Sequence, residues 1–151
     1  MFDRLAQRFG DQPPAPPLLR DIRMESDDDY SRISVLVVDD EPLIADTLAD
    51  ILQEHGFEAR KANSAEEAME IALRARPDIV LTDVLMPRMS GVELGIRIRA
   101  QLPGTQIILI SGQASTAGIL QKAQDEGNWF ELLPKPIHPD ELIARLKGLA
   151  N

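Results

Sequence analysis

The feature that most limits how this chain can fold is a regular alternation of two patterns from residue 33 onward. Short apolar runs, typical of buried strands, occupy residues 33–38, 57–61, 78–82, 105–110 and 129–133. Helical spacing of apolar residues follows each run, over residues 41–55, 64–76, 92–102, 114–126 and 139–149. Strands that alternate with helices in this way form a parallel sheet covered on both faces. We therefore predict an α/β fold, a doubly wound five-stranded parallel sheet in the order 2-1-3-4-5 with five helices.

Capping and turn residues mark the predicted helix borders. Pro42 suits the first turn of one helix, and Gly56 suits its end. Ser64 and Glu67 have the spacing of a capping box, and Pro77 ends the helix that they begin. These residues agree with the periodicity, which strengthens the predicted order of elements.

The first 32 residues differ from the rest. They contain PPAPP at 13–17 and ESDDDY at 25–30, so we predict a disordered or weakly ordered extension over 1–32 and a single domain over 33–151. Met24 is an alternative start of translation. The extension is too short and polar to be an output domain, and the last predicted helix reaches the C-terminus, so we expect a stand-alone domain.

Composition excludes several classes of function. The formal net charge of -9 would repel a nucleic-acid backbone, so we expect no direct nucleic-acid binding. The chain has no cysteine, which excludes disulfides and thiolate metal sites. No apolar run is long enough to span a membrane, and no signal peptide is recognisable. We expect a cytoplasmic protein with no membrane partner.

Polar residues that can bind ions or take part in catalysis follow four of the predicted strands. Asp39 and Asp40 come directly after the first, Asp83 after the third, Ser111 after the fourth and Lys135 after the fifth. In the predicted strand order these ends are neighbours, and ligands of such sheets bind beyond the carboxyl ends. We therefore expect three carboxylates, one hydroxyl and one ammonium group to converge on one site.

Each of these residues also has an ordinary structural explanation. The acidic pair could simply begin a helix, through capping and the helix dipole. Asp83 and Ser111 could be turn residues, and Lys135 could be a solvated surface lysine. Their joint occurrence at the ends of neighbouring strands favours a functional site.

The residue types indicate phosphoryl chemistry. Clustered carboxylates repel one another, and Mg²⁺ relieves that repulsion while it also binds phosphate oxygens. A carboxylate can attack phosphorus and form an aspartyl phosphate. Lys135 and Ser111 could then each stabilise a further phosphoryl oxygen, beside the small residue Gly112.

In these motifs the chain resembles the response-regulator receiver domains of two-component signalling, which are flavodoxin-like domains. The resemblance rests on VLVVDDEP, TDVLMPRMSG, ISG and LLPKP, in order and spacing, and covers residues 33 to about 149. It implies that Asp83 is the phosphoacceptor. It also implies a Mg²⁺ site formed by Asp40, Asp83 and the backbone carbonyl of Leu85, with Asp39 holding the ion mainly through water.

The resemblance assigns roles to further residues. Ser111 corresponds to the switch hydroxyl and Lys135 to the lysine that pairs with the phosphoryl group; the Lys135–Pro136 peptide corresponds to one that is cis in the family. One departure is that Leu132 stands where the family usually has an aromatic switch residue. Strand alternation places Phe130 on the same face as Leu132, so Phe130 is a candidate substitute in the signalling face.

The expected function is therefore that of a phosphoacceptor, not of a conventional enzyme, although it would catalyse its own phosphorylation and dephosphorylation with Mg²⁺. The expected partners are a sensor histidine kinase or phosphotransfer protein and an unidentified downstream protein. An apolar Leu85 predicts slow loss of the phosphoryl group. The alternatives are a phosphate-independent adaptor on the same fold and an aspartyl-nucleophile hydrolase, which lacks support because no insertion could form a cap over a substrate.

Overall fold

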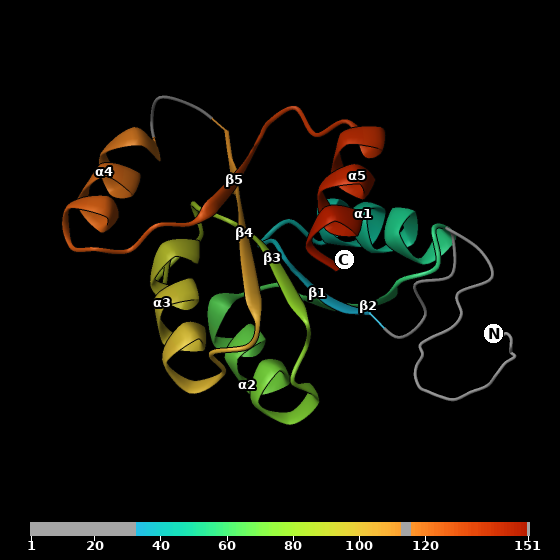
Figure 1. Ribbon diagram of the computed structural model, residues 1–151, viewed down its shortest axis with the longest axis horizontal. Coiled ribbons are helices and arrows are strands. Elements are labelled where there is room, and N and C mark those ends of the chain that lie inside the picture. Colours follow the sequence, from blue (N-terminus) through green and yellow to red (C-terminus); the bar gives the residue numbers. More distant parts are fainter. Residues whose placement is uncertain (1–32, 113–115, 151) are drawn as a thin grey trace, which may run out of the picture. The chain divides into compact units, whose positions relative to one another are not determined.

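The computed structural model describes residues 33–112 and 116–150, and these form one parallel sheet with helices on both faces (Figure 1). The sheet order is β2-β1-β3-β4-β5, so the predicted 2-1-3-4-5 topology is confirmed. The strands are β1 (Ser34–Val38), β2 (Glu58–Ala62), β3 (Ile79–Asp83), β4 (Gln106–Ser111) and β5 (Glu131–Pro134). The prediction of an extension over 1–32 concerns residues outside the described part of the chain.

Helices follow each strand, as the alternation predicts. They are α1 (Pro42–Glu54), α2 (Ala65–Ala75), α3 (Gly91–Gln101), α4 (Ala117–Asp125) and α5 (Pro139–Ala150). Figure 1 shows α1 and α5 on one face of the sheet and α2 and α3 on the other, with α4 beside α3. No helix in the described part of the chain is long and apolar enough to cross a membrane.

The central strands are buried on both faces, because consecutive side chains point to opposite sides of the sheet. Leu36 and Val38 of β1 pack into the core against α2 and α3, together with Val80 and Leu109. The intervening side chains are equally inaccessible and face the side that α1 and α5 cover. This two-sided burial explains why the strands read as continuous apolar runs and not as alternating ones.

Two serines cap helices on the α2–α3 face. The Ser64 hydroxyl accepts a hydrogen bond from the backbone N–H of Glu67 at 3.0 Å, and Ser90 accepts one from Glu93 at 3.1 Å. The Glu67 carboxylate in turn accepts from the backbone N–H of Asn63 at 2.8 Å, one residue before the cap. The predicted capping box therefore forms, shifted by one residue in its second bond.

The fifth strand starts later than predicted. The strand was expected at residues 129–133, but β5 begins at Glu131 and Trp129 is 65% exposed in the preceding loop. The apolar Trp129 and Phe130 resemble strand residues by type, yet neither belongs to a strand because pairing with β4 begins at Glu131. The start of the α4 pattern, predicted at 114, falls partly on residues 113–115, outside the described residues.

Candidate functional site

The carboxyl ends of β1 and β3 bring three carboxylates together. Asp39 follows β1 and is 1% exposed, Asp40 is exposed, and Asp83 is the last residue of β3 and is buried. One carboxylate oxygen from each lies within 4.8 Å of the others. The two strands are hydrogen-bonded neighbours, so residues at their ends must lie close together.

Asp39 is the most constrained of these acids. Its Oδ1 accepts a hydrogen bond from the backbone N–H of Glu41 at 2.9 Å, so it also organises the turn into α1. Its Oδ2 is buried with no hydrogen-bond partner among the described residues. Burial raises the pKa of Asp39, and the nearby charges of Asp83 and Asp40 add to this effect. The Glu41 N–H and Lys135 act in the opposite direction and lower its pKa.

This arrangement fits a divalent cation. A buried carboxylate oxygen without a partner, beside two further carboxylates, is a set of hard oxygen donors of the type that Mg²⁺ prefers. The three acids Asp39, Asp40 and Asp83 are the residues that could hold it. The role expected for the Leu85 carbonyl stays a prediction; the Leu85 side chain is 45% exposed.

Lys135 places a positively charged ammonium group beside Asp83. It follows β5, where its backbone N–H donates to the Ser111 carbonyl at 3.0 Å. Its Nζ lies 3.4 Å from Asp83 Oδ2, in a weak, partly buried ion pair. The Lys135–Pro136 peptide is cis. A Cβ on Gly112 would lie 3.2 Å from the Lys135 Cδ, so the small residue leaves room for the lysine stem.

Ser111 ends β4 at the same edge of the sheet, but its side chain is turned to another partner. The Ser111 and Thr116 hydroxyl oxygens are hydrogen-bonded at 2.7 Å. Thr116 is 2% exposed and lies just before α4. Thr116 was not among the predicted site residues, because a threonine inside a predicted helix carries no signal of its own.

Two further residues position Asp83, and sequence reasoning also missed their role. The Thr82 hydroxyl donates to the Asp83 carbonyl at 3.0 Å, within the buried sheet. Gly91 is the first residue of α3, and a Cβ there would overlap the Asp83 carbonyl oxygen. Only a glycine lets the helix start this close to the strand end. In the sequence, Ser90 and Gly91 stand directly before the predicted third helix, and the glycine was a signal that the helix approaches the strand end closely.

Phe130 and Leu132, the candidate signalling residues, both pack against the core on the α2–α3 side. The Arg99 guanidinium lies over the Phe130 ring, 4.2 Å from its centroid. The ring also touches Gly95, where an added Cβ would come within 2.8 Å of the ring carbon Cε1. Phe130 is thus held on α3. Its expected role as a substitute switch stays a prediction.

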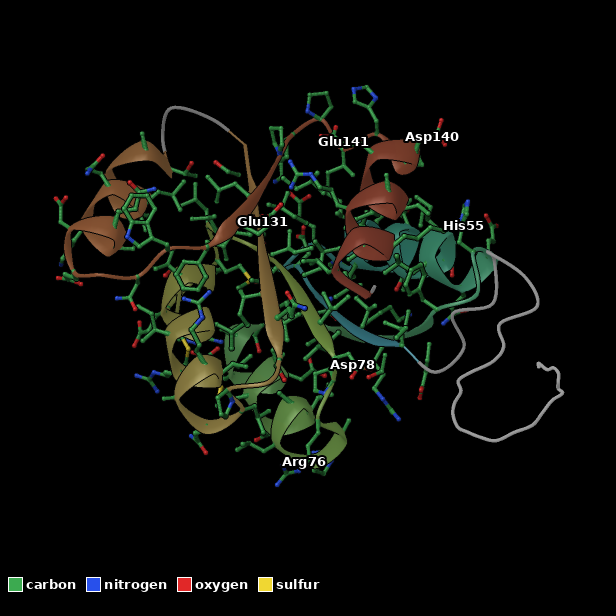
Figure 2. The ribbon with its side chains drawn as sticks, in the orientation of Figure 1. His55, Arg76, Asp78, Glu131, Asp140 and Glu141 are labelled. Carbon is green, nitrogen blue, oxygen red and sulfur yellow. The ribbon has the colours of Figure 1, made fainter. Side chains whose placement is uncertain are left out.

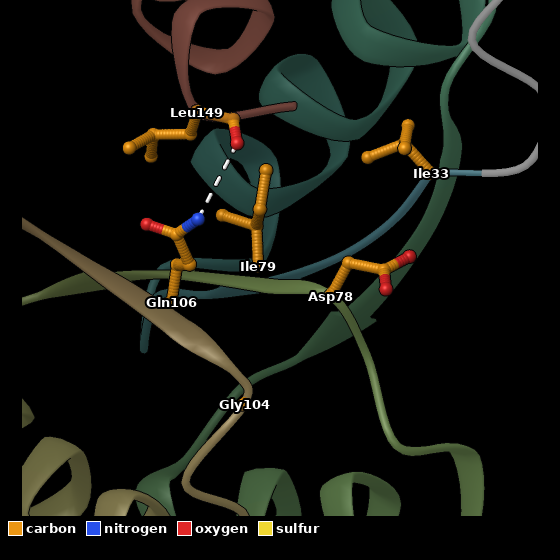
Figure 3. Close-up of a pocket in the computed structure, with 6 residues that line it drawn as sticks. All are labelled: Ile33, Asp78, Ile79, Gly104, Gln106 and Leu149. Carbon is orange, nitrogen blue, oxygen red and sulfur yellow. Dashed lines mark hydrogen bonds between the residues drawn. The ribbon is translucent and has the colours of Figure 1, made fainter. Parts of the chain in front are cut away.

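A separate small pocket lies at the opposite, amino end of the strands. Its lining residues are Ile33, Asp78, Ile79, Gly104, Gln106 and Leu149 (Figure 3). Figure 2 likewise places Asp78 away from Asp140 and Glu141, which lie at the start of α5. The Asp78 carboxylate accepts from the Ser34 N–H at 2.9 Å, and the Gln106 amide donates to the Leu149 carbonyl at 3.3 Å. These polar groups hold the sheet end together, so the carboxyl edge is the stronger candidate site.

The described residues therefore define a flavodoxin-like α/β domain with an acidic cluster and a lysine at the carboxyl edge of its sheet. The response regulator receiver domain family model matches residues 35–147. This chain belongs to that family and is a receiver domain of two-component signalling.

Known relatives agree with this assignment. The chain is 31% identical over 121 residues to the probable transcriptional regulatory protein TcrX of Mycobacterium tuberculosis, covering 80% of this chain and 51% of that protein. It is 33% identical over 119 residues to the response regulator MprA of Mycobacterium leprae, covering 76% and 50%. The chain thus spans about half the length of the curated relatives it matches.

Solved structures show the same fold. A response regulator receiver domain protein from Clostridium thermocellum matches with a TM-score of 0.70 and 28% identity, over 78% of this chain and 93% of that chain. The chemotaxis protein CheY4 of Vibrio cholerae matches with a TM-score of 0.67 and 30% identity, over 78% and 98%. The similarity therefore extends over most of each matched chain.

Proposed function

We propose that this receiver accepts a phosphoryl group on Asp83 from the phosphohistidine of a sensor histidine kinase or phosphotransfer protein. The observation that carries the proposal is the place of Asp83, within a cluster of three carboxylates and 3.4 Å from the Lys135 ammonium group. An Asp83 oxygen attacks phosphorus, and a P–O bond forms as the P–N bond to the donor imidazole breaks. The imidazole takes up a proton and leaves as the neutral ring.

The acidic cluster is suited to hold Mg²⁺ in this reaction. Asp39, Asp40 and Asp83 would provide oxygen donors, and the orphaned Asp39 Oδ2 supports this assignment. Bound Mg²⁺ would neutralise charge on the carboxylates and on a phosphoryl oxygen.

The remaining residues act on the transferred group. Lys135 would exchange its weak contact with Asp83 for a contact with a phosphoryl oxygen, and Ser111 would donate its hydroxyl proton to another. Loss of the group by attack of water would regenerate the Asp83 carboxylate and release inorganic phosphate. The apolar, half-exposed Leu85 stands two residues after Asp83, where we propose that it hinders this water.

The downstream partner is proposed to be a protein that reads the surface changed by phosphorylation. Matched relatives include proteins named as DNA-binding response regulators, which are about twice as long as the matched region. The described residues carry the receiver fold, and its surface is the part that a protein partner would contact.

Incubation with Mg²⁺ and acetyl phosphate, followed by intact-mass measurement, tests the phosphoacceptor. We expect one added phosphoryl group in the wild type, none in Asp83→Asn and none when EDTA removes the metal. Asp50→Asn, an exposed acid on α1, is the matched control and should behave as wild type.

Two results would contradict the proposal. A mass gain that survives Asp83→Asn would place the phosphoryl group on another residue. The absence of any gain, with Mg²⁺ binding intact, would favour a phosphate-independent adaptor on the same fold.

A further inference from the structure

The hydroxyl of Ser111 is held away from the site in this structure. Its hydrogen bond goes to Thr116 at 2.7 Å, and within the described residues none joins it to Asp83 or Lys135. Thr116 is 2% exposed, so water cannot readily replace this bond. Either hydroxyl could be the donor in this pair; where Ser111 donates, its single proton cannot also go to a phosphoryl oxygen.

The Thr116 hydroxyl, just before α4, also bonds to Ser111 and not to its own helix. Thr116 occupies the residue before α4, where a threonine would normally accept a backbone N–H of its own helix. It has φ of -95° and ψ of -6° and forms no side-chain cap, in contrast to Ser64 and Ser90 at α2 and α3. The Thr116 hydroxyl therefore bonds to the end of β4 in place of capping its helix.

We propose that Thr116 is a positioning residue that restrains the Ser111 hydroxyl until Asp83 is phosphorylated. This inference rests on the proposed phosphoacceptor role of Asp83. In the unphosphorylated protein the two hydroxyls are hydrogen-bonded, with Ser111 taken as the donor. When a phosphoryl group occupies Asp83, Ser111 gives up this bond and donates to a phosphoryl oxygen, which releases the residue that begins α4. Thr116 thus sets how strongly the phosphorylated arrangement is favoured, and it couples that arrangement to α4.

If Thr116 restrains Ser111, removing the Thr116 hydroxyl should increase the affinity for a phosphoryl mimic. Thr116→Val keeps the side-chain shape but leaves Ser111 without its competing partner. A net hydrogen bond of ordinary strength corresponds to about a three- to tenfold change in an equilibrium constant. We therefore expect Thr116→Val to bind a phosphoryl mimic about three- to tenfold more tightly than the wild type. Thr116→Ser retains the hydroxyl and should bind nearly as the wild type does.

Beryllofluoride titration at fixed Mg²⁺, followed by the ¹⁹F NMR signal of the bound form, measures this affinity on the full chain. Ser111→Ala and the double variant Ser111→Ala/Thr116→Val complete a cycle. We expect Thr116→Val to change nothing in the Ser111→Ala background, because the restrained hydroxyl is then absent. Mg²⁺ affinity, measured separately, verifies that each variant folds and keeps its acidic cluster.

Three results would overturn the inference. Unchanged or weaker binding by Thr116→Val would mean that Thr116 does not compete for Ser111. Equal tightening in the Ser111→Ala background would assign the effect to the start of α4 and not to the hydroxyl pair. If the wild type binds no beryllofluoride while Mg²⁺ still binds, the proposed role of Asp83 fails, and this inference fails with it.

Discussion

At the scale of single residues, the most unusual charge of the site is Asp39, which lies where solvent cannot compensate it. The Asp39 carboxylate is almost fully buried, and one of its oxygens has no hydrogen-bond partner in the part of the chain that the structure describes. Its pKa is raised, first by burial and then by the charges of Asp83 and Asp40. Lys135 offsets only part of this repulsion, at 3.4 Å from Asp83 Oδ2. The metal-free protein therefore keeps a mutually repelling cluster of carboxylates, which a bound cation would relieve.

Asp39→Asn should consequently stabilise the metal-free protein while it weakens Mg²⁺ binding. The amide removes one negative charge and can still accept the Glu41 N–H, so we expect the free energy of unfolding to rise. Thermal unfolding in EDTA and a Mg²⁺ titration would measure the two effects. Asp50→Asn on the exposed face of α1 should change neither. A metal-free Asp39→Asn protein less stable than the wild type would contradict this view of the cluster.

At the scale of elements, the site depends on how closely α3 approaches the end of β3. Gly91 begins α3, and its N–H donates to the Val84 carbonyl at 2.9 Å. Ser90 caps the same helix, which fixes where its first turn lies. The loop after Asp83 therefore has little freedom at its far end, and the acid is held by the backbone on both sides.

Gly91→Ala should be costly because the new methyl group would meet backbone, which cannot rotate away. Its Cβ would overlap the Asp83 carbonyl oxygen and lie 3.1 Å from the Thr82 hydroxyl. We expect a loss of about 1–3 kcal/mol in the free energy of unfolding, measured by urea denaturation, and slower phosphorylation of Asp83. Gly148→Ala in α5 is the matched control, since a Cβ there has no heavy atom within 4 Å. Equal stability of the two variants would show that α3 can move away from β3 at little cost.

At the scale of the whole molecule, ligand binding and folding are linked because the cluster exists only when the strands pair. Asp39 and Asp83 are 44 residues apart in the chain and meet through the β1–β3 register. Any cation that binds this cluster stabilises the folded state relative to the unfolded chain.

Saturating Mg²⁺ should therefore raise the free energy of unfolding, by about 2.7 kcal/mol at a concentration one hundred times the dissociation constant. Thermal unfolding with and without Mg²⁺, at matched ionic strength, measures the rise. Asp40→Asn and Asp83→Asn should lose most of it, because each removes a charged donor from the cluster. A rise of the same size in those variants would place the stabilising ion elsewhere.

Features that leave a local pattern in the sequence could be predicted, and features that depend on contacts between distant residues could not. Periodicity predicted the five-stranded order because the burial of β1, β3 and β4 on both faces leaves a local signature of apolar runs. Strand-end position predicted that three carboxylates, the Ser111 hydroxyl and Lys135 converge, since parallel strands align their carboxyl ends. The carboxylates and Lys135 do meet, whereas the Ser111 hydroxyl is bonded to Thr116. The start of β5 was misplaced because Trp129 has the type of a strand residue but lies where no strand pairs with it.

The fold, the family and the residues gathered at the carboxyl edge of the sheet could be predicted from the amino-acid sequence. These follow from patterns that recur along the chain and from residue types at strand ends. Three other features became visible only after packing: Ser111 is bonded to Thr116, Phe130 is held between Gly95 and Arg99, and Asp39 has an oxygen without a partner among the described residues. Each of these depends on which rotamer and which neighbour a side chain finds after packing. Such choices are made by contacts distant in sequence or by loop geometry, and no local pattern encodes them.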